Sequence, residues 1–297
     1  MSPASSTPTH APASEAAVTL DELLRLLTLR EEDGYAVGQP QQHPEDRVFG
    51  GLLLAQAVVA AGRSVPAHHR PFTLQADFVA GVPTDEPLRW RVDHVSEAAS
   101  LTTRRTTLVA PDGSERFTAL SRWGSVRDDL ADHRPAAARA APAPEELPGL
   151  PERFGDDERI PRWWRAERPV HFRHTEAPPY VETTARQDHQ SAWLRTTSAL
   201  PDDPVVHAAV VAYVTDMSIL EGAFRALGSR RHAPGSRILS LTHTLAWHAH
   251  PDLSSWHQFD SEVRAVAHGR TQGEGRIFDR DGHHVVTAGQ VGLVRLA

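Results

Sequence analysis

Two segments of this 297-residue chain are apolar around the whole circumference of a helix, and they constrain its fold more than any other feature. GGLLLAQAVVAAGRSV, residues 50–65, has Gln56 as its main polar interruption. VVHAAVVAYVTDMSILEGAF, residues 205–224, is nearly all apolar and predicts a second long helix. Because such a helix has no polar face, it must be buried on all sides.

Strand signals follow each apolar segment in the same order. In the first half they cover residues 72–80, 88–95, 100–110 and 116–123. In the second half they cover residues 240–247, 256–266, 273–279 and 284–294. An Asp-Gly pair joins the last two signals of each set, Asp112-Gly113 in the first and Asp281-Gly282 in the second. These pairs predict a β-hairpin in each half.

The two halves can be laid over each other. FTLQADFVAGVPTDEPLRW matches LSLTHTLAWHAHPDLSSWHQF in pattern, which places Thr73 on Ser240. APDGSERFTALSRWG matches DRDGHHVVTAGQVGL, which places Ser121 on Gln290. Such repetition indicates the duplication of one supersecondary unit. We therefore predict an α+β fold with two units in tandem, each a long buried helix wrapped by an antiparallel β-sheet.

Composition divides the chain into four segments. We predict a disordered tail at 1–18, a first domain at 19–125, a linker at 126–168 and a second domain at 169–297. TLDE, which begins at Thr19, is a capping box that starts the first helix. The linker is rich in Ala, Pro, Arg and acidic residues, so it can bury little surface. Its Trp163 and Trp164 are expected to pack against a domain.

Composition also excludes several classes of function. The chain has no Cys, so it has no disulfide, no Cys-ligated metal and no thiol nucleophile. It has no Lys, so an anion must be bound by Arg, His or backbone N–H groups. A net charge of −7 argues against a nucleic-acid partner. No apolar stretch is long enough to span a membrane, and residues 1–17 lack the features of a signal peptide, so a cytoplasmic location is expected.

A carboxylate within an apolar segment is the strongest local irregularity. Asp216 follows the apolar residues 208–214 in the second predicted helix. Burying an ionised carboxylate is costly unless it has partners. Either Asp216 caps a helix segment or pairs with an Arg, or it is a general base that orients a water molecule.

Gln290 and Ser240 are polar residues in predicted strands. The amide of Gln290 either faces solvent or binds a carbonyl oxygen and a water molecule. Strand alternation predicts that Ser240 shares a face with Thr242 and Thr244, while His243 lies on the opposite face. From the residues alone, Ser240 is expected to be an exposed hydroxyl at a strand end.

Eighteen His residues raise the question of a metal site. His248 and His250 are two residues apart, but no further ligand has a recognised spacing, so we predict no metal. His207 and His243 lie in apolar patterns, where a His is either a satisfied core residue or an acid or base. No GxSxG motif is present, which leaves carboxylate acid–base chemistry as the main route for a hydrolase.

An ordered series of segments resembles one enzyme family. The segments are TLDELLRLLTLREEDGYAVGQPQQHPEDRVFGGLLLAQAVVA, SLTTRR, HAAVVAYVTDMSIL, LSLTHTLAWH and DGHHVVTAGQVGLVR. They are similar to acyl-CoA thioesterase II, the bacterial TesB-type family. The resemblance implies a double hot-dog fold that hydrolyses acyl-CoA to free acid and CoA without a cofactor. It also implies a homodimer or a homotetramer.

The family's catalytic set is an Asp, a Thr and a Gln, all from the second hot-dog. By motif, Asp216 matches the Asp, Gln290 matches the Gln and Ser240 stands at the Thr, keeping the hydroxyl and losing the methyl group. Ser121 stands opposite Gln290 in the first half, so one active site per chain is expected. The implied mechanism is direct attack by a water molecule that Asp216 deprotonates.

Further residues are expected to bind the acyl-CoA substrate. Backbone N–H groups at the start of the first apolar helix or Gln290 would stabilise the oxyanion, and Arg side chains would meet the CoA phosphates. The expected substrate-binding residues are Gly50, Gly51, Gln56, Arg104, Arg105, His243 and Arg270.

Two other functions stay open at this point. A hot-dog hydratase or dehydratase acting on acyl thioesters would need an Asp–His pair, which Asp216 could form with His207 or His243. A non-catalytic acyl-CoA-binding protein is the second alternative, since Ser240 and Thr242 depart from the family pattern.

Overall fold

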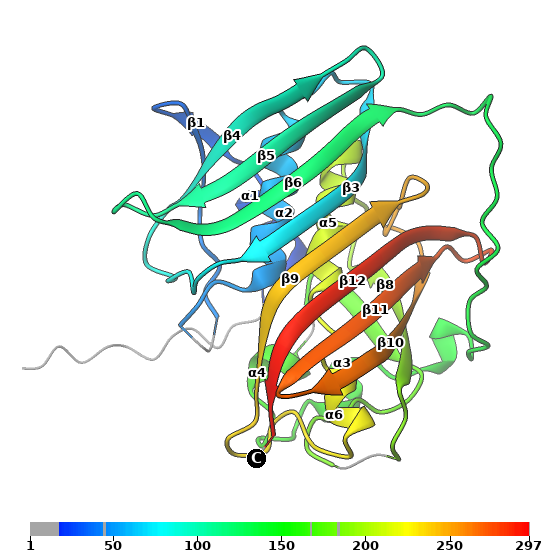
Figure 1. Ribbon diagram of the computed structural model, residues 1–297. Coiled ribbons are helices and arrows are strands. Elements are labelled where there is room, and N and C mark those ends of the chain that lie inside the picture. Colours follow the sequence, from blue (N-terminus) through cyan, green and yellow to red (C-terminus); the bar gives the residue numbers. More distant parts are fainter. Residues whose placement is uncertain (1–17, 44–45, 167, 183–184, 297) are drawn as a thin grey trace, which may run out of the picture.

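Twelve strands of this protein form one continuous antiparallel sheet (Figure 1). The computed structural model describes residues 18–43, 46–166, 168–182 and 185–296, so the predicted tail lies outside the described residues apart from Val18. The strand order is β1-β2-β4-β5-β6-β3-β9-β12-β11-β10-β8-β7. From the central strand β3 outward, the first half runs β3-β6-β5-β4-β2-β1, and from its neighbour β9 outward the second half runs β9-β12-β11-β10-β8-β7. Counted along each half, the strands follow the same order, which confirms the predicted duplication.

The first half precedes the linker and carries the central helix α2. Its elements are α1 (Leu20–Leu26), β1 (Arg30–Glu32), β2 (Tyr35–Gly38), α2 (Gly50–Gly62), β3 (His69–Phe78), β4 (Leu88–Glu97), β5 (Leu101–Val109) and β6 (Glu115–Ser125). Thr19 caps α1 as predicted, its hydroxyl accepting from the Glu22 N–H at 3.2 Å. The edge strands β1 and β2 are not in the sequence prediction.

The second half carries the central helix α5. Its elements are β7 (Val170–His174), β8 (His189–Thr196), α5 (Pro204–Thr215), α6 (Gly222–Ala226), β9 (Arg237–Trp247), β10 (His257–Ala267), β11 (Arg270–Phe278) and β12 (His284–Arg295). The two predicted hairpins are present, since β5 pairs with β6 and β11 with β12. Strands β7 and β8 extend the sheet in the place that β1 and β2 occupy in the first half.

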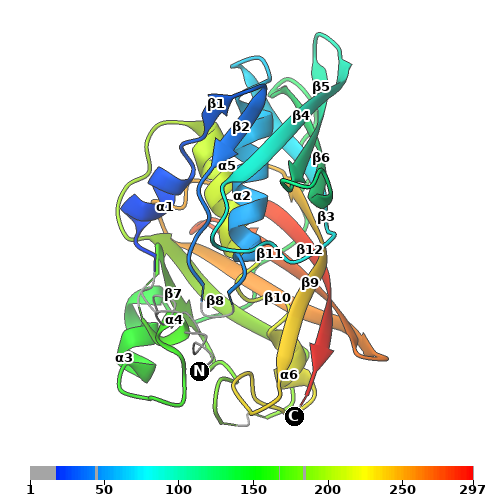
Figure 2. The same cartoon turned by 90° about the vertical axis from the view of Figure 1, so that its left-hand side faces the viewer.

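The two apolar helices pack against each other on one face of the sheet (Figure 2). Residues 51–62 of α2 and 206–215 of α5 are all buried, as a helix without a polar face requires. The helices run antiparallel, because a Cβ at Gly51 would meet the Tyr213 carbonyl oxygen and a Cβ at Gly62 would meet Val205. Each half is therefore a helix wrapped by antiparallel strands, and the fold is a tandem hot-dog.

The prediction of one unbroken helix over residues 205–224 is wrong. Helix α5 ends at Thr215, and a run of turns separates it from the short helix α6. Thr215, Asp216 and Ser218 cluster at this point, and short polar side chains bond to nearby backbone in competition with the helix. Thr215 is placed to do so here, since its Oγ lies 3.1 Å from the Ala212 carbonyl oxygen.

The linker is tied to the second half. It contains the short helices η1 (Pro144–Glu146), α3 (Leu150–Phe154) and α4 (Arg162–Arg165). The Arg139 N–H donates to Asp260 at 2.7 Å, and the Trp193 indole donates to the Pro142 carbonyl at 2.9 Å. Trp163 and Trp164 are buried, which confirms that this segment packs on a domain. No helix in the described part of the chain is long and apolar enough to cross a membrane.

Candidate active site

Asp216 lies where the C-terminal end of α5 meets the N-terminal end of α2. It is the C-cap residue of α5, and its carboxylate accepts a hydrogen bond from the Gly51 N–H. The N-cap residue of α2, Phe49, offers no side-chain acceptor. Asp216 therefore caps a helix of the other half of the chain, and the positive end of the α2 dipole favours its negative charge.

Ser240 and Gln290 complete a compact polar group with Asp216. The Ser240 hydroxyl donates to Asp216 Oδ1 at 3.1 Å, and the Gln290 amide nitrogen donates to the same oxygen at 2.5 Å. The Gln290 amide also donates to Ser240 Oγ at 2.8 Å. The structure thus brings together the three residues that the sequence singled out.

A β-bulge in β9 sets the direction of Ser240. Gln290 on β12 is paired with His243 and Gly292 with Ser240, and the register shifts between Val291 and Gly292. Leu241 is the extra residue, so Ser240 lies on the same face of the sheet as Gln290 and His243. The expectation that Ser240 and His243 occupy opposite faces, with Ser240 exposed, is wrong because regular alternation stops at this bulge.

The environment of Asp216 brings the pKa of its carboxyl group close to neutral pH. Burial raises the pKa of its carboxyl from 3.8 to about 7, against hydrogen bonds from Ser240, Gln290 and the Gly51 N–H, which lower it. The side chain still lines a pocket, so solvent and a ligand can reach it. A carboxylate with a pKa near 7 can take up and release a proton at neutral pH.

The pocket beside Asp216 has a volume of about 320 Å³ and is built from both halves and the linker. One wall consists of aromatic rings from two segments, His43, Phe49, Trp163 and Trp164, and Phe78 also lines the pocket. His43 holds this wall together, with its ring centroid 5.0 Å from that of Trp163 and 5.8 Å from that of Trp164. The linker therefore contributes part of the binding site, which sequence reasoning missed.

The same pocket contains a buried charged group. Arg168, Glu221 and Arg231 all line it, and each is less than a tenth exposed. Burial raises the pKa of Glu221, while the nearby Arg231 and Arg168 lower it. Neither arginine was expected from the sequence, since both lie in loops without a recognised motif.

Gly50 leaves room for a ligand at the carboxylate. A Cβ at Gly50 would lie 2.7 Å from Asp216 Oδ2 and 2.9 Å from the Phe78 ring. Any side chain would fill the space in front of that oxygen. Gly50 lines the pocket, whereas the Gly51 N–H is used by Asp216.

Two of the predicted substrate-binding residues are structural. The Gln56 amide donates to the carbonyls of Leu26 and Gln39 at 2.8 and 3.0 Å and accepts from the Trp90 indole at 2.9 Å. Gln56 therefore joins α2 to α1, to the segment after β2 and to β4.

Arg104 is also structural. Its guanidinium is 1% exposed, donating to the Ser64 carbonyl at 2.7 Å and to Glu97 at 2.6 Å. Arg105 and Arg270 are exposed on β5 and β11 and do not line the pocket. The buried positions of Gln56 and Arg104 correct two of the predicted substrate contacts, whereas contact of Arg105 and Arg270 with the CoA phosphates stays a prediction.

His243 does not face the pocket either. It is fully buried in β9, and its Nε2 lies 3.1 Å from the Thr215 hydroxyl. His207 lies near the other end of α5, where its Nε2 is 3.0 Å from the Pro201 carbonyl. Neither His has a hydrogen bond or ion pair to Asp216 in the described structure, so the Asp–His pair of the hydratase alternative is not formed by these residues.

The described residues of the first half hold no second copy of the polar group. Asp216 is the C-cap of α5, and the equivalent C-cap of α2 is Arg63. Arg63 bonds to Asp203 at the start of α5, at 2.8 Å. Ser121, opposite Gln290, accepts from the Trp123 indole at 2.9 Å. An arginine has thus replaced the carboxylate at the pseudo-symmetric position.

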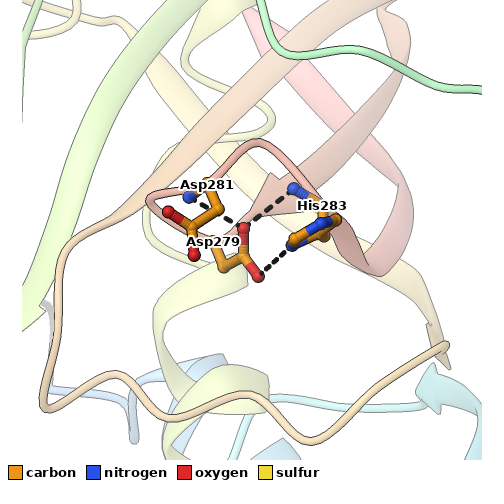
Figure 3. A group of neighbouring side chains, drawn as sticks. All are labelled: Asp279, Asp281 and His283. Carbon is orange, nitrogen blue, oxygen red and sulfur yellow. Dashed lines mark hydrogen bonds and ion pairs between the residues drawn. The ribbon is translucent and has the colours of Figure 1, made fainter.

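One group in the described residues has the composition of a metal site. Asp279, Asp281 and His283 gather on the β11–β12 hairpin, with their ligand atoms within 4.8 Å of one another (Figure 3). Asp279 already accepts from the N–H groups of Asp281 and His283 at 3.0 and 2.8 Å, and its second oxygen lies 3.0 Å from the His283 ring. These bonds stabilise the turn, and the group is remote in sequence from the pocket residues.

Comparisons with known proteins agree with this architecture. Residues 39–124 match a model described as the acyl-CoA thioesterase N-terminal domain, and residues 135–294 match the corresponding C-terminal domain. The chain is 24% identical to acyl-CoA thioesterase 2 of Haemophilus influenzae, over 94% of this chain and 98% of that protein. It is also 24% identical to acyl-coenzyme A thioesterase 8 of Mus musculus, over 84% of this chain and 81% of that protein.

A solved structure shows the same fold. The crystal structure of an acyl-CoA thioesterase II, TesB2, from Mycobacterium marinum matches with a TM-score of 0.75 at 24% identity. The match covers 93% of this chain and 98% of that one. With both domain models matched in order along its length, this chain belongs to the acyl-CoA thioesterase family.

Proposed function

We propose that this protein hydrolyses acyl-CoA to a free acid and CoA, with Asp216 as the general base that activates water. The observation that carries the proposal is the Asp216 carboxylate itself. It faces the pocket, it accepts from Ser240, Gln290 and Gly51, and its pKa is about 7. The family to which the chain belongs supports an acyl-CoA substrate.

The geometry suggests separate roles for the two carboxylate oxygens. Oδ1 is held by Ser240 and Gln290, so its direction is fixed. Oδ2 lies beside Gly50, where the absent side chain leaves space for a water molecule. Oδ2 takes a proton from this water as the water oxygen attacks the thioester carbonyl carbon. The Gly50 N–H stabilises the oxyanion, because the Gly51 N–H is used by Asp216 and the Leu52 and Leu53 N–H groups bond to the Phe49 carbonyl.

The second step returns the proton. When the tetrahedral intermediate collapses, the C–S bond breaks and the electron pair leaves with the CoA sulfur. The protonated Asp216 gives its proton to this thiolate, and the products are a carboxylic acid and CoA thiol. A carboxyl pKa near 7 suits both steps, because the group must accept and then donate within one cycle. No acyl-enzyme and no cofactor are needed.

The test replaces Asp216 with Asn and measures thiol release across a panel of acyl-CoA substrates. We expect Asp216→Asn to lower kcat by about 10²- to 10⁴-fold, the usual contribution of a positioned acid–base group. Asp203→Asn is the matched control, because Asp203 is a carboxylate at the other end of α5 that bonds to Arg63. It should leave kcat unchanged.

Other outcomes would favour the alternatives. Unchanged thiol release by Asp216→Asn would remove Asp216 from the mechanism. A wild-type protein inactive on every chain length, yet able to bind acyl-CoA, would support the non-catalytic function. Loss of water from 3-hydroxyacyl thioesters without thiol release would support the hydratase. A cytoplasmic location and a homodimeric or homotetrameric assembly stay predictions from the sequence.

A further inference from the structure

A fully buried histidine stands directly behind the amide of Gln290. His243 on β9 is the cross-strand partner of Gln290 on β12, so the two side chains leave neighbouring strands on the same face of the sheet. His243 is 0% exposed and does not line the pocket. It therefore cannot touch a substrate, but it can act on Gln290.

The second ring nitrogen of His243 faces the end of α5. Its Nε2 lies 3.1 Å from the hydroxyl of Thr215, the residue that precedes Asp216. The same hydroxyl is 3.1 Å from the Ala212 carbonyl, and its single proton can go to only one of these two acceptors. A continuous line of polar groups thus runs from Thr215 through His243 to Gln290.

The hydrogen-bond requirements of this line fix the position of one proton. An ionised Asp216 can only accept, so Gln290 must present its amide nitrogen to it, as observed, and direct Oε1 away. Gln290 Oε1 and His243 Nδ1 are both buried, and neither has a partner within hydrogen-bonding geometry in the described structure. The two residues are cross-strand partners, and leaving both atoms as bare buried acceptors would be unfavourable.

We propose that His243 is a positioning residue, which carries its proton on Nδ1 and donates it to Gln290 Oε1, so that the amide nitrogen of Gln290 always faces Asp216. Thr215 completes the line by donating its hydroxyl proton to His243 Nε2. The proposal rests on the proposed role of Asp216 as the general base and extends that site inward by two residues.

The surroundings of His243 are consistent with a neutral ring. Burial lowers its pKa to about 3, and the neighbouring Gln290 side chain opposes this shift. A neutral imidazole has one N–H and one acceptor nitrogen, as the line of bonds requires. Without the His243 donor, the Gln290 amide could turn its oxygen toward Asp216 and repel the carboxylate.

The titratable residues that line the pocket around Asp216 are His43, Arg47, Arg168, Glu221 and Arg231.

The first test determines which ring nitrogen of His243 carries the proton in the wild-type protein. With ¹⁵N-labelled histidine, the two ring nitrogens of His243 are distinguished by NMR, and the spectrum of a His243→Asn variant assigns them by difference. We expect a neutral ring protonated at Nδ1 at neutral pH. A neutral ring protonated at Nε2 would overturn the proposal, and this result does not depend on any variant's activity.

The second test compares three variants by thiol release. His243→Phe removes the donor and keeps a ring, and we expect kcat to fall about 10- to 100-fold with little change in KM, as for other residues that orient a reacting group. The midpoint of its kcat/KM profile should also move to higher pH, because the pKa of Asp216 rises when a hydrogen bond that lowers this pKa is lost. In His243→Asn, the amide nitrogen can replace Nδ1, so most of the activity should return.

The control is a buried His–Thr pair in the other half. His69 is 2% exposed, and its Nδ1 lies 3.3 Å from the Thr102 hydroxyl. His69→Phe should lower stability and leave kcat and the pH profile of the folded enzyme unchanged. If His243→Phe behaves like His69→Phe while Asp216→Asn is inactive, the positioning role fails and the general base stands. If Asp216→Asn is fully active, the proposed function itself fails.

Discussion

Opposing influences on Asp216 together give its carboxyl group a pKa that suits a general base at neutral pH. Burial disfavours the carboxylate, whereas three hydrogen bonds and the N-terminal end of α2 favour it. The result is a pKa of about 7, well above that of an ordinary aspartate. A fully solvated Asp would be a weak base, and a buried Asp without donors would stay protonated at neutral pH.

The pH dependence of activity should follow this carboxyl. The base must be ionised in the free enzyme, so kcat/KM is expected to rise with pH, with a midpoint near the Asp216 pKa of about 7, and then to level off. Thiol release measured from about pH 5 to about pH 9 checks this. A profile already flat at pH 5 would mean that the base has the acidity of an exposed carboxylate.

The stability of the protein should respond to Asp216 in the opposite sense. The folded pKa of about 7 lies above the unfolded value of 3.8, so between these values the folded state holds a proton that the unfolded state has released. The free energy of unfolding contributed by this group therefore falls as pH rises through that window, and the deficit is complete above it.

Asp216→Asn removes this deficit. At pH 8 we expect the variant to unfold at higher urea, with a gain on the order of 1–2 kcal/mol because the carboxylate is partly reached by solvent. The gain should disappear at low pH, where both states of the wild type are protonated. Asp203→Asn should instead lose stability, since the pKa of that N-cap carboxyl is lowered in the folded state. Equal stability of Asp216→Asn and wild type at pH 8 would contradict the raised pKa.

How much of the site the sequence predicts differs from residue to residue. Asp216 is recognisable because a carboxylate in an apolar run breaks the local pattern. The direction of Ser240 is not, because a β-bulge is set by the pairing of β9 with β12 rather than by a local signal. The depth of His243 and Arg104 is likewise decided by tertiary packing, so substrate contacts assigned to them from the sequence are wrong.

At the scale of elements, the site depends on how two antiparallel helices end. Helix α2 begins where α5 stops, and the close approach is made by Gly51, which a side chain would prevent. The premature end of α5 at Thr215 is what places Asp216 at the start of α2. Apolar periodicity predicts both helices, but it continues past residue 215 and therefore overestimates the length of α5.

Gly51→Ala should separate these ends. Its Cβ would meet the Phe49 ring and lie 2.5 Å from the Tyr213 carbonyl oxygen, so α2 must shift away from α5. We expect a loss of about 1–3 kcal/mol in the free energy of unfolding, as for other overpacked contacts. Because the Gly51 N–H also moves, kcat/KM should fall and its midpoint should move to higher pH.

Gly149→Ala is the control for this substitution. A Cβ there has the Pro151 ring carbon at 3.7 Å as its nearest neighbour, an ordinary contact, and Gly149 has an extended backbone. Stability and activity should stay close to wild type. If Gly51→Ala also leaves both unchanged, the close approach of α2 and α5 does not position Asp216.

At the scale of the whole molecule, duplication explains the fold better than the chemistry. The strands follow the same order in both halves, and β3 pairs with β9 to join them into one sheet. The sequence repeat predicts the two units, but not the joining of their sheets, because the pairing of β3 with β9 depends on how the two units pack and has no local sequence signal. The C-cap residue is a carboxylate at only one of the two pseudo-symmetric helix junctions, and at the other it is Arg63.

The active site should therefore require both halves of the chain. Helices α2 and α5 bury their apolar surfaces against each other, and the Gly51 N–H of the first half bonds to Asp216 of the second. A cut between Leu130 and Ala131 falls in an exposed stretch and leaves the linker bonds to the second half intact. We expect either fragment alone to be insoluble or unfolded, because each exposes one face of an apolar helix and a central strand.

Co-expression of the two fragments should restore a folded complex that releases thiol from acyl-CoA. Circular dichroism and size exclusion report its assembly, and the thiol assay reports the site. The matched control carries Asp216→Asn in the second fragment, and this pair should assemble yet stay inactive. Activity of the second fragment alone would show that Asp216, Ser240 and Gln290 need neither the α2 N-terminus nor the pocket wall from the first half. That outcome would reduce the first half to a scaffold.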